Sequence, residues 1–350
     1  ITKEDEILST KINQIKKIKD LDRSIINIEN FDLKPLVIGE GIIDKYLFSS
    51  GLGKSGKDSI LTLKNLGQKS YLGGSYAVAN NLSQYVKKVG LISDFTNKGS
   101  NQNFIRKNLN NKIDFKPFFK KDSVTTTKTK ILDNNSNNKV LGLYEIDDRS
   151  LSQKEELRLF KLIKKEIKKY DFFIVTDYDH GLISKELFKK ISNLKKKIIS
   201  TSQLNAANSA YHDLKKLDKS DLMVINFNEL ISFFKRKNLK NKDPLFLGNK
   251  FINETKVKNL IITVGSNGSY YLNKKKSFYF PALTQHIVGD KIGSGDSFMS
   301  LASLAFMKNA HPLIIMLIGA LSASFNLKGL ANSISSNKKS FFRILNNLII

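Results

Sequence analysis

One stretch decides the fold of this chain: Gly289-Asp290-Lys291-Ile292-Gly293-Ser294-Gly295-Asp296-Ser297-Phe298. After it, apolar residues recur at helical spacing, at Phe298, Leu301, Ala302, Ala305 and Phe306. The pattern predicts a helix that begins between Ser294 and Asp296. The start of a helix presents unpaired N–H groups and the positive end of the helix dipole, and neighbouring glycines leave those groups open to a ligand.

Asp296 admits two interpretations. As a general base, it would take a proton from a hydroxyl while the helix start stabilises the charge that develops on a phosphoryl group. As an N-cap, it would only close a tight turn between a strand and a helix. The stretch by itself favours neither interpretation, so the remaining sequence has to separate them.

Composition narrows the class of partner. The chain has 350 residues, enough for one large domain or two modest ones. Its formal net charge of +26 would suit nucleic acid, an anionic membrane or phosphorylated substrates. The lysines are scattered, however, and the sequence contains no nucleic-acid motif. We therefore expect a small-molecule substrate and no nucleic-acid partner.

Metal and membrane signals are also weak. Cysteine is absent from the sequence, which excludes disulfides and thiolate metal sites. The four histidines do not have the spacing of zinc ligands. The longest apolar run, residues 312–325, is too short to span a bilayer and predicts a buried helix. We expect a cytoplasmic protein with no membrane partner.

Short apolar segments alternate with helical patterns after residue 35. The expected strands are 36–39, 89–92, 172–175, 197–199, 222–225 and 260–264. Between them, Ser152 and Glu155 form a capping box that opens a helix with Leu157 and Ile163 on its apolar face. This order predicts an α/β fold in which helices cover both faces of a mostly parallel sheet.

Ligands bind beyond the carboxyl ends of the strands in such a sheet. The expected strand ends carry Asp44, Asp177, Asn226 and Gly265, and the turn with Asp296 joins them. Short polar side chains that converge at one edge favour a site over chance.

Two segments, 45–72 and 123–146, break the alternation of strands and helices. The second alternates polar and apolar residues on either side of an Asn-rich turn at 134–138, which predicts a hairpin. Both segments predict a small β lid over the open edge of the main sheet.

The first of these segments contains an apparent P-loop at residues 51–57. Asp58 stands where the metal-binding hydroxyl belongs, and no apolar helix follows, so we reject a P-loop. Lys54 and Lys57 are expected to contact a substrate phosphate, and the alternative is that they are solvated lysines of the lid.

Three further motifs are weak when taken singly. Gly73 and Gly74 open a helix and let a polyol or a phosphate approach the backbone, or they permit close packing. Asn226 and Glu229 lie on one side of a starting helical turn and suit Mg²⁺ held partly through water, although Asn226 would also serve as a cap. Residues 263–268 end a strand with two glycines and suit a phosphate or a ribose.

In this order, the motifs resemble those of the ribokinase-like, or pfkB-type, carbohydrate kinases. The counterparts of the family pattern are Gly39 to Asp44, Gly73-Gly74, Asn226 to Glu229, Thr263 to Gly268 and Asp290 to Asp296. The resemblance implies a three-layer α/β/α sandwich with a mostly parallel central sheet and a small β lid. Within the family, the run Asp177-Tyr178-Asp179-His180-Gly181 looks like a segment of the heptose 7-phosphate kinases of ADP-heptose synthesis.

The resemblance also implies roles for the matched residues. Asp296 would be the catalytic base, and the N–H groups of Gly293, Ser294 and Gly295 would form an anion hole. The nucleotide and its Mg²⁺ would contact Asn226, Glu229, Thr263, Gly265, Gly268, Asp290 and Asn326. The sugar would contact Asp44, Gly73, Gly74, Asn80, Lys57 and Lys130. ATP and Mg²⁺ are the implied cofactors, with a monovalent cation such as K⁺ and a homodimer formed through the lid as further expectations.

Three positions depart from the family pattern. Ala77 stands where the family commonly has Asn, so Asn80 or Asn81 would have to substitute for it. His180 replaces a Lys of the heptose kinases, and residues 202–208 replace their VDPK-like strand end. These departures concern the sugar side of the site and not the ATP side.

Residues 1–35 are charged and weakly amphipathic, and we interpret them as a linker or an appended helix ahead of a kinase domain at 36–350. The segment from Leu8 to Ile12 is similar to the tail of cytidylyltransferase-like nucleotidyltransferases. That similarity would fit a fused protein with two enzymes.

We expect ATP-dependent phosphorylation of a sugar or a sugar phosphate, with a heptose 7-phosphate-like acceptor favoured. The same fold acting on a hexose, a ribose or a nucleoside is the first alternative, which a panel of acceptors would reveal. A relative that only binds sugar or nucleotide, suggested by Ala77, would not turn over ATP. Nucleic-acid binding would show an affinity that falls steeply with salt.

Overall fold

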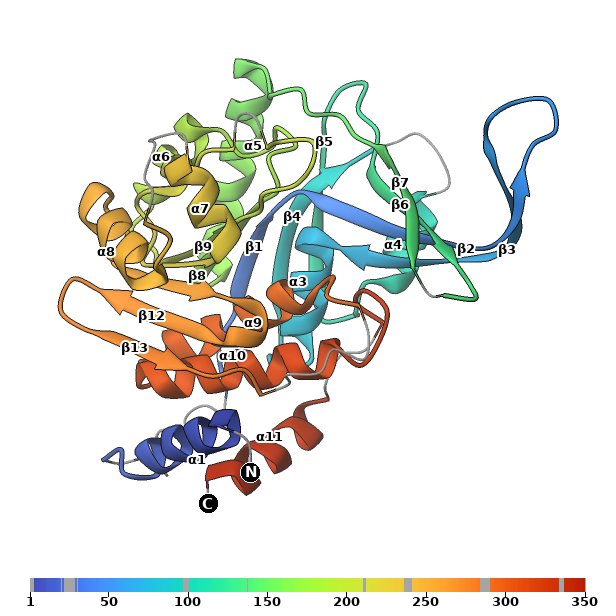
Figure 1. Cartoon of the computed structure of the whole chain (residues 1–350). Helices are drawn as coiled ribbons and strands as arrows, with labels where there is room; N and C mark the ends of the chain where they lie inside the picture. Colours follow the sequence, from blue (N-terminus) through green and yellow to red (C-terminus); the bar gives the residue numbers. More distant parts are fainter. Residues whose placement is uncertain are drawn as a thin grey trace.

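The computed structural model describes residues 3–19, 21, 29, 31–96, 101–136, 138–209, 212–235, 241–283, 290–333 and 337–349. Within these residues, the main sheet has nine strands in the order β13-β12-β11-β10-β9-β8-β1-β4-β5 (Figure 1). They are β1 (Pro35–Gly39), β4 (Val89–Phe95), β5 (Ile113–Phe119), β8 (Phe172–Asp177), β9 (Ile198–Ser202), β10 (Leu222–Asn226), β11 (Asn259–Thr263), β12 (Ser269–Asn273) and β13 (Ser277–Phe280). The seven strands from β5 to β11 pair in parallel, and β12 and β13 add an antiparallel edge. The mostly parallel sheet predicted from the sequence is confirmed.

Helices cover both faces of this sheet, as the near-continuous apolar strands require. On β1, Val37 faces one core, and Leu36 and Ile38 face the other, because successive side chains of a strand point to opposite faces. The first core includes α3 (Gly74–Ser83), α4 (Asn101–Asn108), α9 (Ser294–Met307) and α10 (Pro312–Asn326). The second includes α5 (Gln153–Glu166), α6 (Lys185–Ser192), α7 (Phe227–Lys235) and α8 (Pro244–Glu254). Short 3₁₀ turns lie at Ile167–Lys169, Leu214–Leu217 and Gly265–Asn267.

Helix α5 shows where local sequence signals succeed and fail. Its capping box is present: Ser152 Oγ accepts from the N–H of Glu155, and the Glu155 carboxylate accepts from the N–H of Ser152. The expected apolar face is wrong in part, since Leu157 is 48% exposed whereas Leu159 and Ile163 are buried. Leu159 instead joins Ile163 in the core on this face of the sheet.

A second sheet forms the lid, in the order β3-β2-β6-β7. Its strands are β2 (Gly41–Lys54), β3 (Leu61–Gly73), β6 (Thr126–Asp133) and β7 (Lys139–Glu145). Strands β2 and β6 are parallel and the two outer pairs are antiparallel. The predicted lid and its second hairpin are confirmed, and the β2–β3 hairpin projects well away from the body of the protein (Figure 1).

The first helix, α1 (Lys3–Lys16), packs beside the last, α11 (Lys338–Ile349), below the main sheet (Figure 1). Ile15 of α1 is fully buried and belongs to the same core as Phe341 and Leu345. The predicted helix at 312–325 is confirmed as α10, which is largely buried. None of the helices described here is long and apolar enough to cross a membrane.

Candidate active site

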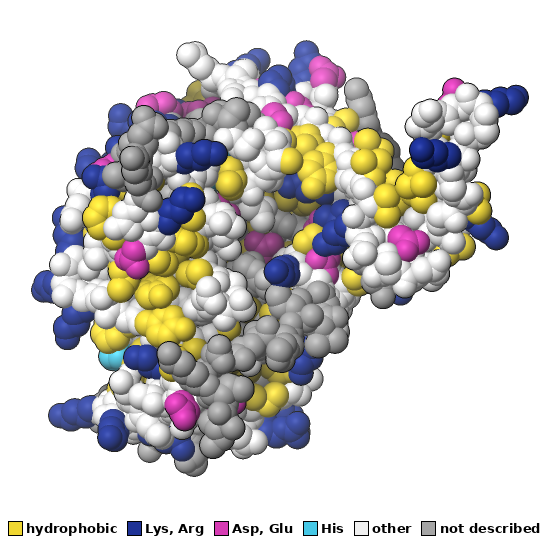
Figure 2. Space-filling view, viewed as in Figure 1, with side chains coloured by type: hydrophobic (Ala, Val, Ile, Leu, Met, Phe, Trp, Pro, Cys, Tyr) yellow, Lys and Arg dark blue, Asp and Glu magenta, His cyan; other side chains and the backbone are white. Residues whose placement is uncertain are grey.

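A cavity of about 670 Å³ lies between the carboxyl ends of the main strands and the lid. Figure 2 shows a hollow on this face, with acidic and basic side chains beside it. The cavity is lined by residues from both sheets and from the start of α9. Among them are most of the predicted site residues: Asp44, Gly74, Lys130, Asn226, Glu229, Thr263, Gly265, Gly268, Gly293, Ser294, Gly295 and Asp296.

The start of α9 is open to this cavity. Gly293 is the N-cap, with a left-handed φ of 84°, and a Cβ there would lie 2.1 Å from Asn332 Oδ1. Asp296 is therefore not the cap, and that interpretation is wrong. The Ser294 N–H donates to the Lys291 carbonyl at 3.3 Å. Among the described residues, the N–H groups of Gly293, Gly295 and Asp296 have no recorded acceptor, so two of the three predicted amides stay open and Asp296 adds another.

Asp296 has the protonation behaviour of a base that works near neutral pH. Burial raises the pKa of Asp296 to about 7, and the nearby Asp44 carboxylate raises it too. A hydrogen bond from Tyr178 and the ammonium of Lys128 act in the opposite direction. A carboxylate with a pKa near 7 is matched to general-base catalysis at physiological pH.

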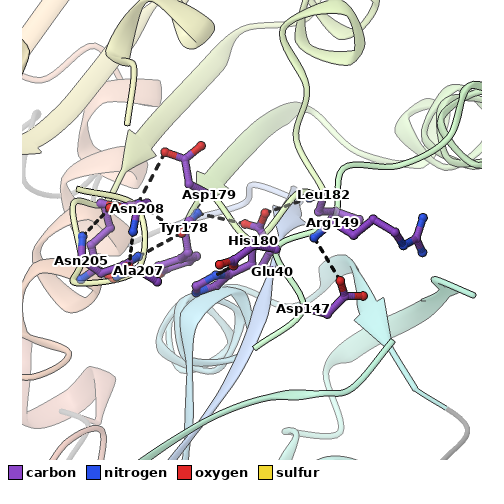
Figure 3. A network of polar contacts seen from close by, with 12 residues as sticks. Glu40, Asp147, Arg149, Tyr178, Asp179, His180, Leu182, Asn205, Ala207 and Asn208 are labelled. Atoms are coloured by element: carbon purple, nitrogen blue, oxygen red, sulfur yellow. Dashed lines mark hydrogen bonds and ion pairs between the residues drawn. The ribbon is translucent and has the colours of Figure 1, made fainter. Parts of the chain in front are cut away.

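Tyr178 was not among the predicted site residues. Its hydroxyl donates a 2.8 Å hydrogen bond to Asp296 Oδ1, and it lines the cavity. The turn that carries it is held by the fully buried Glu40, whose carboxylate accepts from the N–H groups of Tyr178 at 2.9 Å and Leu182 at 3.1 Å (Figure 3). Strand alternation could not indicate this residue, because Tyr178 lies in the turn just after Asp177, the last residue of β8.

The expectation that Asp177 belongs to the site is wrong. Its side chain is fully buried and forms an ion pair with Lys216 at 2.6 Å. Lys216 also pairs with Asp179, so the two carboxylates hold one ammonium behind the turn. His180 is likewise buried, and its Nδ1 lies 2.7 Å from Asp148 Oδ1. Neither Asp177 nor His180 lines the cavity.

Asn226 and Glu229 lie at the junction of β10 and α7. The Glu229 carboxylate accepts from the N–H groups of Asn226 at 2.6 Å and Leu204 at 3.2 Å, and burial raises the pKa of Glu229 to about 8. Asn226 Oδ1 accepts from the Asn228 N–H at 2.9 Å. The described residues contain no group of three metal-binding side chains. The oxygen donors present fit a magnesium ion that is held mainly through water and phosphate oxygens.

The turn after β11 carries Gly265 and Gly268, which were predicted to contact the nucleotide. Gly265 has a φ of 57°, and a Cβ there would meet nothing within 4 Å, which leaves its backbone open to a ligand. Gly268 has a φ of 83°, and a Cβ there would lie 2.2 Å from the Phe280 carbonyl oxygen. Both glycines line the cavity, and Gly268 in addition allows β13 to approach.

The lid carries the residues on the acceptor half of the cavity, that is, those predicted to contact the sugar. Asp44 on β2 forms a 2.5 Å ion pair with Lys130 on β6. Gly73 does not line the cavity, but a Cβ there would lie 2.4 Å from Asp44 Oδ2, so it makes room for the carboxylate. Gly74, with a φ of 57°, does line the cavity.

Besides Gly73, four predicted contact residues lie outside the cavity. Asn80 donates to the Asn108 carbonyl and accepts from the Asn110 N–H, both at 3.0 Å, so it fixes the chain after α4 instead of binding sugar. Lys57 is exposed on the turn between β2 and β3, outside the cavity. Asn326 is buried and donates to Asn332 Oδ1 at 3.3 Å.

Asp290 is the fourth of these residues. Its carboxylate accepts hydrogen bonds from the Tyr46 hydroxyl on β2 and, at 2.7 Å, from the Lys139 ammonium on β7. It therefore ties two lid strands to the segment before α9 and does not line the cavity. The neighbouring Gly289, and His286 before it, lie outside the described residues.

Residues 33–337 match the pfkB family of carbohydrate kinases, and the chain belongs to this family. It is a sugar kinase by that membership. The chain is 23% identical to the bifunctional protein HldE of a Nitratiruptor species over 285 residues, which are 80% of this chain and 58% of that protein. It is 26% identical to HldE of Helicobacter pylori over 278 residues, 79% of this chain and 58% of that protein. The chain thus spans somewhat more than half of the length of these relatives.

Solved structures share the fold. The ribokinase of Thermotoga maritima matches with a TM-score of 0.68 at 17% identity, over 90% of this chain and 100% of that one. Phosphofructokinase-2 of Escherichia coli in complex with potassium matches with a TM-score of 0.69 at 14% identity, over 90% and 99%. At these identities the likeness concerns the ribokinase-like fold alone.

Proposed function

We propose that this carbohydrate kinase transfers the γ-phosphoryl group of ATP to a sugar phosphate of the heptose 7-phosphate type. The observation that carries the proposal is Asp296, a carboxylate with a pKa of about 7 beside open amides of a helix start, on the wall of a 670 Å³ cavity. The sequence similarity to HldE proteins and the resemblance of residues 177–181 to the heptose 7-phosphate kinases support the choice of acceptor.

In this mechanism, Asp296 removes the proton from the acceptor hydroxyl, and the resulting oxygen attacks the γ-phosphorus. A bond forms between that oxygen and phosphorus while the bond to the β-phosphate oxygen breaks, and ADP leaves. The N–H groups of Gly295 and Asp296 stabilise the transferring group. Asn226 and Glu229 would hold, through water, a magnesium ion that neutralises phosphate charge.

Replacement of Asp296 by Asn tests the proposal. Without the base, turnover should fall by about 10²–10⁴-fold, whereas ATP binding should persist, because its contacts lie on β10, β11 and the helix start. Release of ADP with a panel of heptose, hexose and nucleoside acceptors and isothermal titration with ATP supply the two readouts. Residual turnover close to wild type would remove Asp296 from its role. Binding by the wild type without turnover of any acceptor would favour a non-catalytic relative.

Two smaller proposals accompany the reaction. A monovalent cation such as K⁺ would support catalysis, since a structural relative was solved with potassium. Measurement of activity in potassium and in tetramethylammonium salts tests this proposal.

A homodimer formed through the lid would cover apolar side chains that are 58–63% exposed, namely Leu52, Leu61, Leu141 and Leu143. Light scattering of Leu141→Asp against wild type measures whether a dimer is lost.

We also propose that residues 36–350 form the kinase domain and that residues 1–35, whose helix α1 packs on its core, join it to a preceding nucleotidyltransferase. The family match begins at residue 33, close to this boundary, and the HldE relatives extend beyond the matched region. The reading frame upstream of Ile1 provides the test, since it should encode a second enzyme.

A further inference from the structure

Lys128 is the feature of the acceptor half that the mechanism leaves unused. It lies on β6, in register with Asp44 on β2 and Tyr144 on β7. Lys130 follows two residues later and shares its face of the lid, because side chains of a strand alternate. Both lysines are only 8% exposed, and both line the cavity.

The two ammonium groups differ in their partners. Lys130 Nζ lies 2.5 Å from Asp44 Oδ1, so its charge is neutralised within the protein. Lys128 Nζ makes no ion pair or hydrogen bond with any residue that the structure describes. Its nearest recorded partner is the Tyr144 ring, 5.8 Å from Nζ to the centroid. Within the described part of the chain, Lys128 is thus a buried cation without an ion-pair partner.

Such a group is costly, because an ammonium taken out of water needs a paired negative charge. Burial lowers the pKa of Lys128, and the neighbouring Lys130 lowers it further, while the Asp44 carboxylate acts to raise it. Glu40 and Asp296 also act to raise it, but none of these three carboxylates forms a recorded ion pair with Lys128 among the described residues. An anionic group of a ligand in the cavity would supply the close counterion that these carboxylates do not provide.

We propose that Lys128 binds a phosphate group that the acceptor sugar already carries, and so selects phosphorylated sugars over free ones. The proposal rests on the proposed function, since it concerns the second substrate of that reaction. Lys128 belongs to the lid, beside Asp44, whereas the nucleotide residues come from β10, β11 and the start of α9. Tyr144 lines the cavity next to Lys128, and its hydroxyl provides a second donor. Lysine commonly binds phosphate as a point charge.

Paired acceptors test the proposal. Wild type and Lys128→Met are assayed for ADP release with sedoheptulose and sedoheptulose 7-phosphate, with fructose and fructose 6-phosphate, and with ribose and ribose 5-phosphate. Loss of a charge-assisted contact should lower kcat/KM for the phosphorylated member of an accepted pair by about 10- to 100-fold, mainly through KM. The free sugar should change by less than about threefold, and Lys128→Arg should restore part of the loss.

Lys64→Met is the matched control, because Lys64 is an exposed lysine of lid strand β3 outside the cavity. It should leave both members of each pair unchanged. Lys128→Met should fold with wild-type or greater thermal stability, since it removes an unpaired buried charge. That measurement separates the loss of a contact from misfolding.

The outcomes are distinct. An unchanged KM for the phosphorylated sugars in Lys128→Met overturns the inference, and so does an equal loss with free and phosphorylated sugars, which would assign Lys128 to the phosphoryl group in transfer. If the wild type turns over no acceptor, the proposed function fails. Calorimetric binding of the same sugar phosphates without ATP then decides: binding that Lys128→Met weakens supports the inference, and binding that is absent or unaffected overturns it.

Discussion

The hydroxyl of Tyr178 and the carboxylate of Asp296 are joined by a 2.8 Å hydrogen bond between residues that lie 118 positions apart in the sequence. Glu40 holds the backbone of Tyr178 from behind, because its buried carboxylate accepts from the N–H groups at both ends of the turn. The turn after β8 therefore places the Tyr178 hydroxyl against the carboxylate of Asp296, at the start of α9.

The first prediction concerns Tyr178→Phe. In the wild type, kcat/KM should fall below pH 7, because protonation of Asp296, with its pKa of about 7, removes the base. Loss of the hydroxyl removes a donor that stabilises the carboxylate, so this acidic limb should move up by about one pH unit. The pH profile of kcat/KM measures the shift.

Tyr170→Phe is the matched control for that experiment. Tyr170 also donates from a hydroxyl to a carboxylate, that of Asp114, at 3.0 Å, but away from the cavity. It should leave the acidic limb in place. An unshifted limb in Tyr178→Phe, with kcat lowered at every pH alike, would show that the hydroxyl does not control ionisation of the base.

The second prediction concerns the stability of Asp296→Asn. Because the folded pKa of Asp296 lies above the ordinary value for Asp, the folded state binds its proton more tightly than the unfolded chain does. Its unfavourable contribution is absent below about pH 4 and grows as the pH rises toward 7. Asp296→Asn should therefore be more stable than wild type at pH 8, by on the order of 1–2 kcal/mol, and by much less at pH 5.

Urea unfolding at both pH values, without nucleotide, measures this difference. Asp243→Asn serves as a comparison, since Asp243 is an exposed helix cap whose carboxylate accepts from the Phe246 N–H. It should leave stability nearly unchanged at both pH values, because Asn and Asp are about equally good N-cap residues. A destabilised Asp296→Asn at pH 8 would show that the carboxylate is stabilising where it lies.

The third prediction separates two glycines of the helix start. Gly293→Ala places a Cβ at a φ of 84° and 2.1 Å from Asn332 Oδ1, so the variant should lose stability. Gly295→Ala meets nothing within 4 Å and should fold as well as wild type. Its methyl group should instead occupy space at the open amides and reduce turnover.

Thermal unfolding and ADP release, measured on both variants, check the two halves of this expectation. The pair controls itself, because the same substitution is made two residues apart. Full activity of Gly295→Ala would mean that phosphoryl transfer takes place away from this helix start.

Local patterns predicted the fold and much of the site, and long-range packing decided the rest. Strand alternation and glycine turns placed Asn226, Gly265 and Asp296 at one edge of the sheet, where the cavity lies. The assignment of Asp177 was wrong because its partner, Lys216, lies on a short 3₁₀ turn that no periodicity indicates. Lys57 was predicted to contact the substrate but lies outside the cavity. The sequence does not show how far the β2–β3 hairpin carries it from the site.

Asn80 and Asp290 show the same limit. The side chain of Asn80 is engaged by backbone groups 28 and 30 residues later, and Asp290 by side chains 244 and 151 residues earlier. Partners at such separations follow from the way the two sheets pack. Lys128 and Lys130 share one face of β6 because side chains of a strand alternate, and the structure shows that only Lys130 has an ion-pair partner among the described residues.

The two bonds from Tyr46 and Lys139 to Asp290 bear on the catalytic cycle. Asp290 is only 8% exposed, so a lid that lifts would strip both donors from a carboxylate that has little water to replace them. Release of the products therefore requires the loss of these two hydrogen bonds, in addition to the loss of the contacts between the products and the site. We therefore expect the escape of ADP and the phosphorylated sugar, and not the making of the new phosphoester, to set the pace of each turnover.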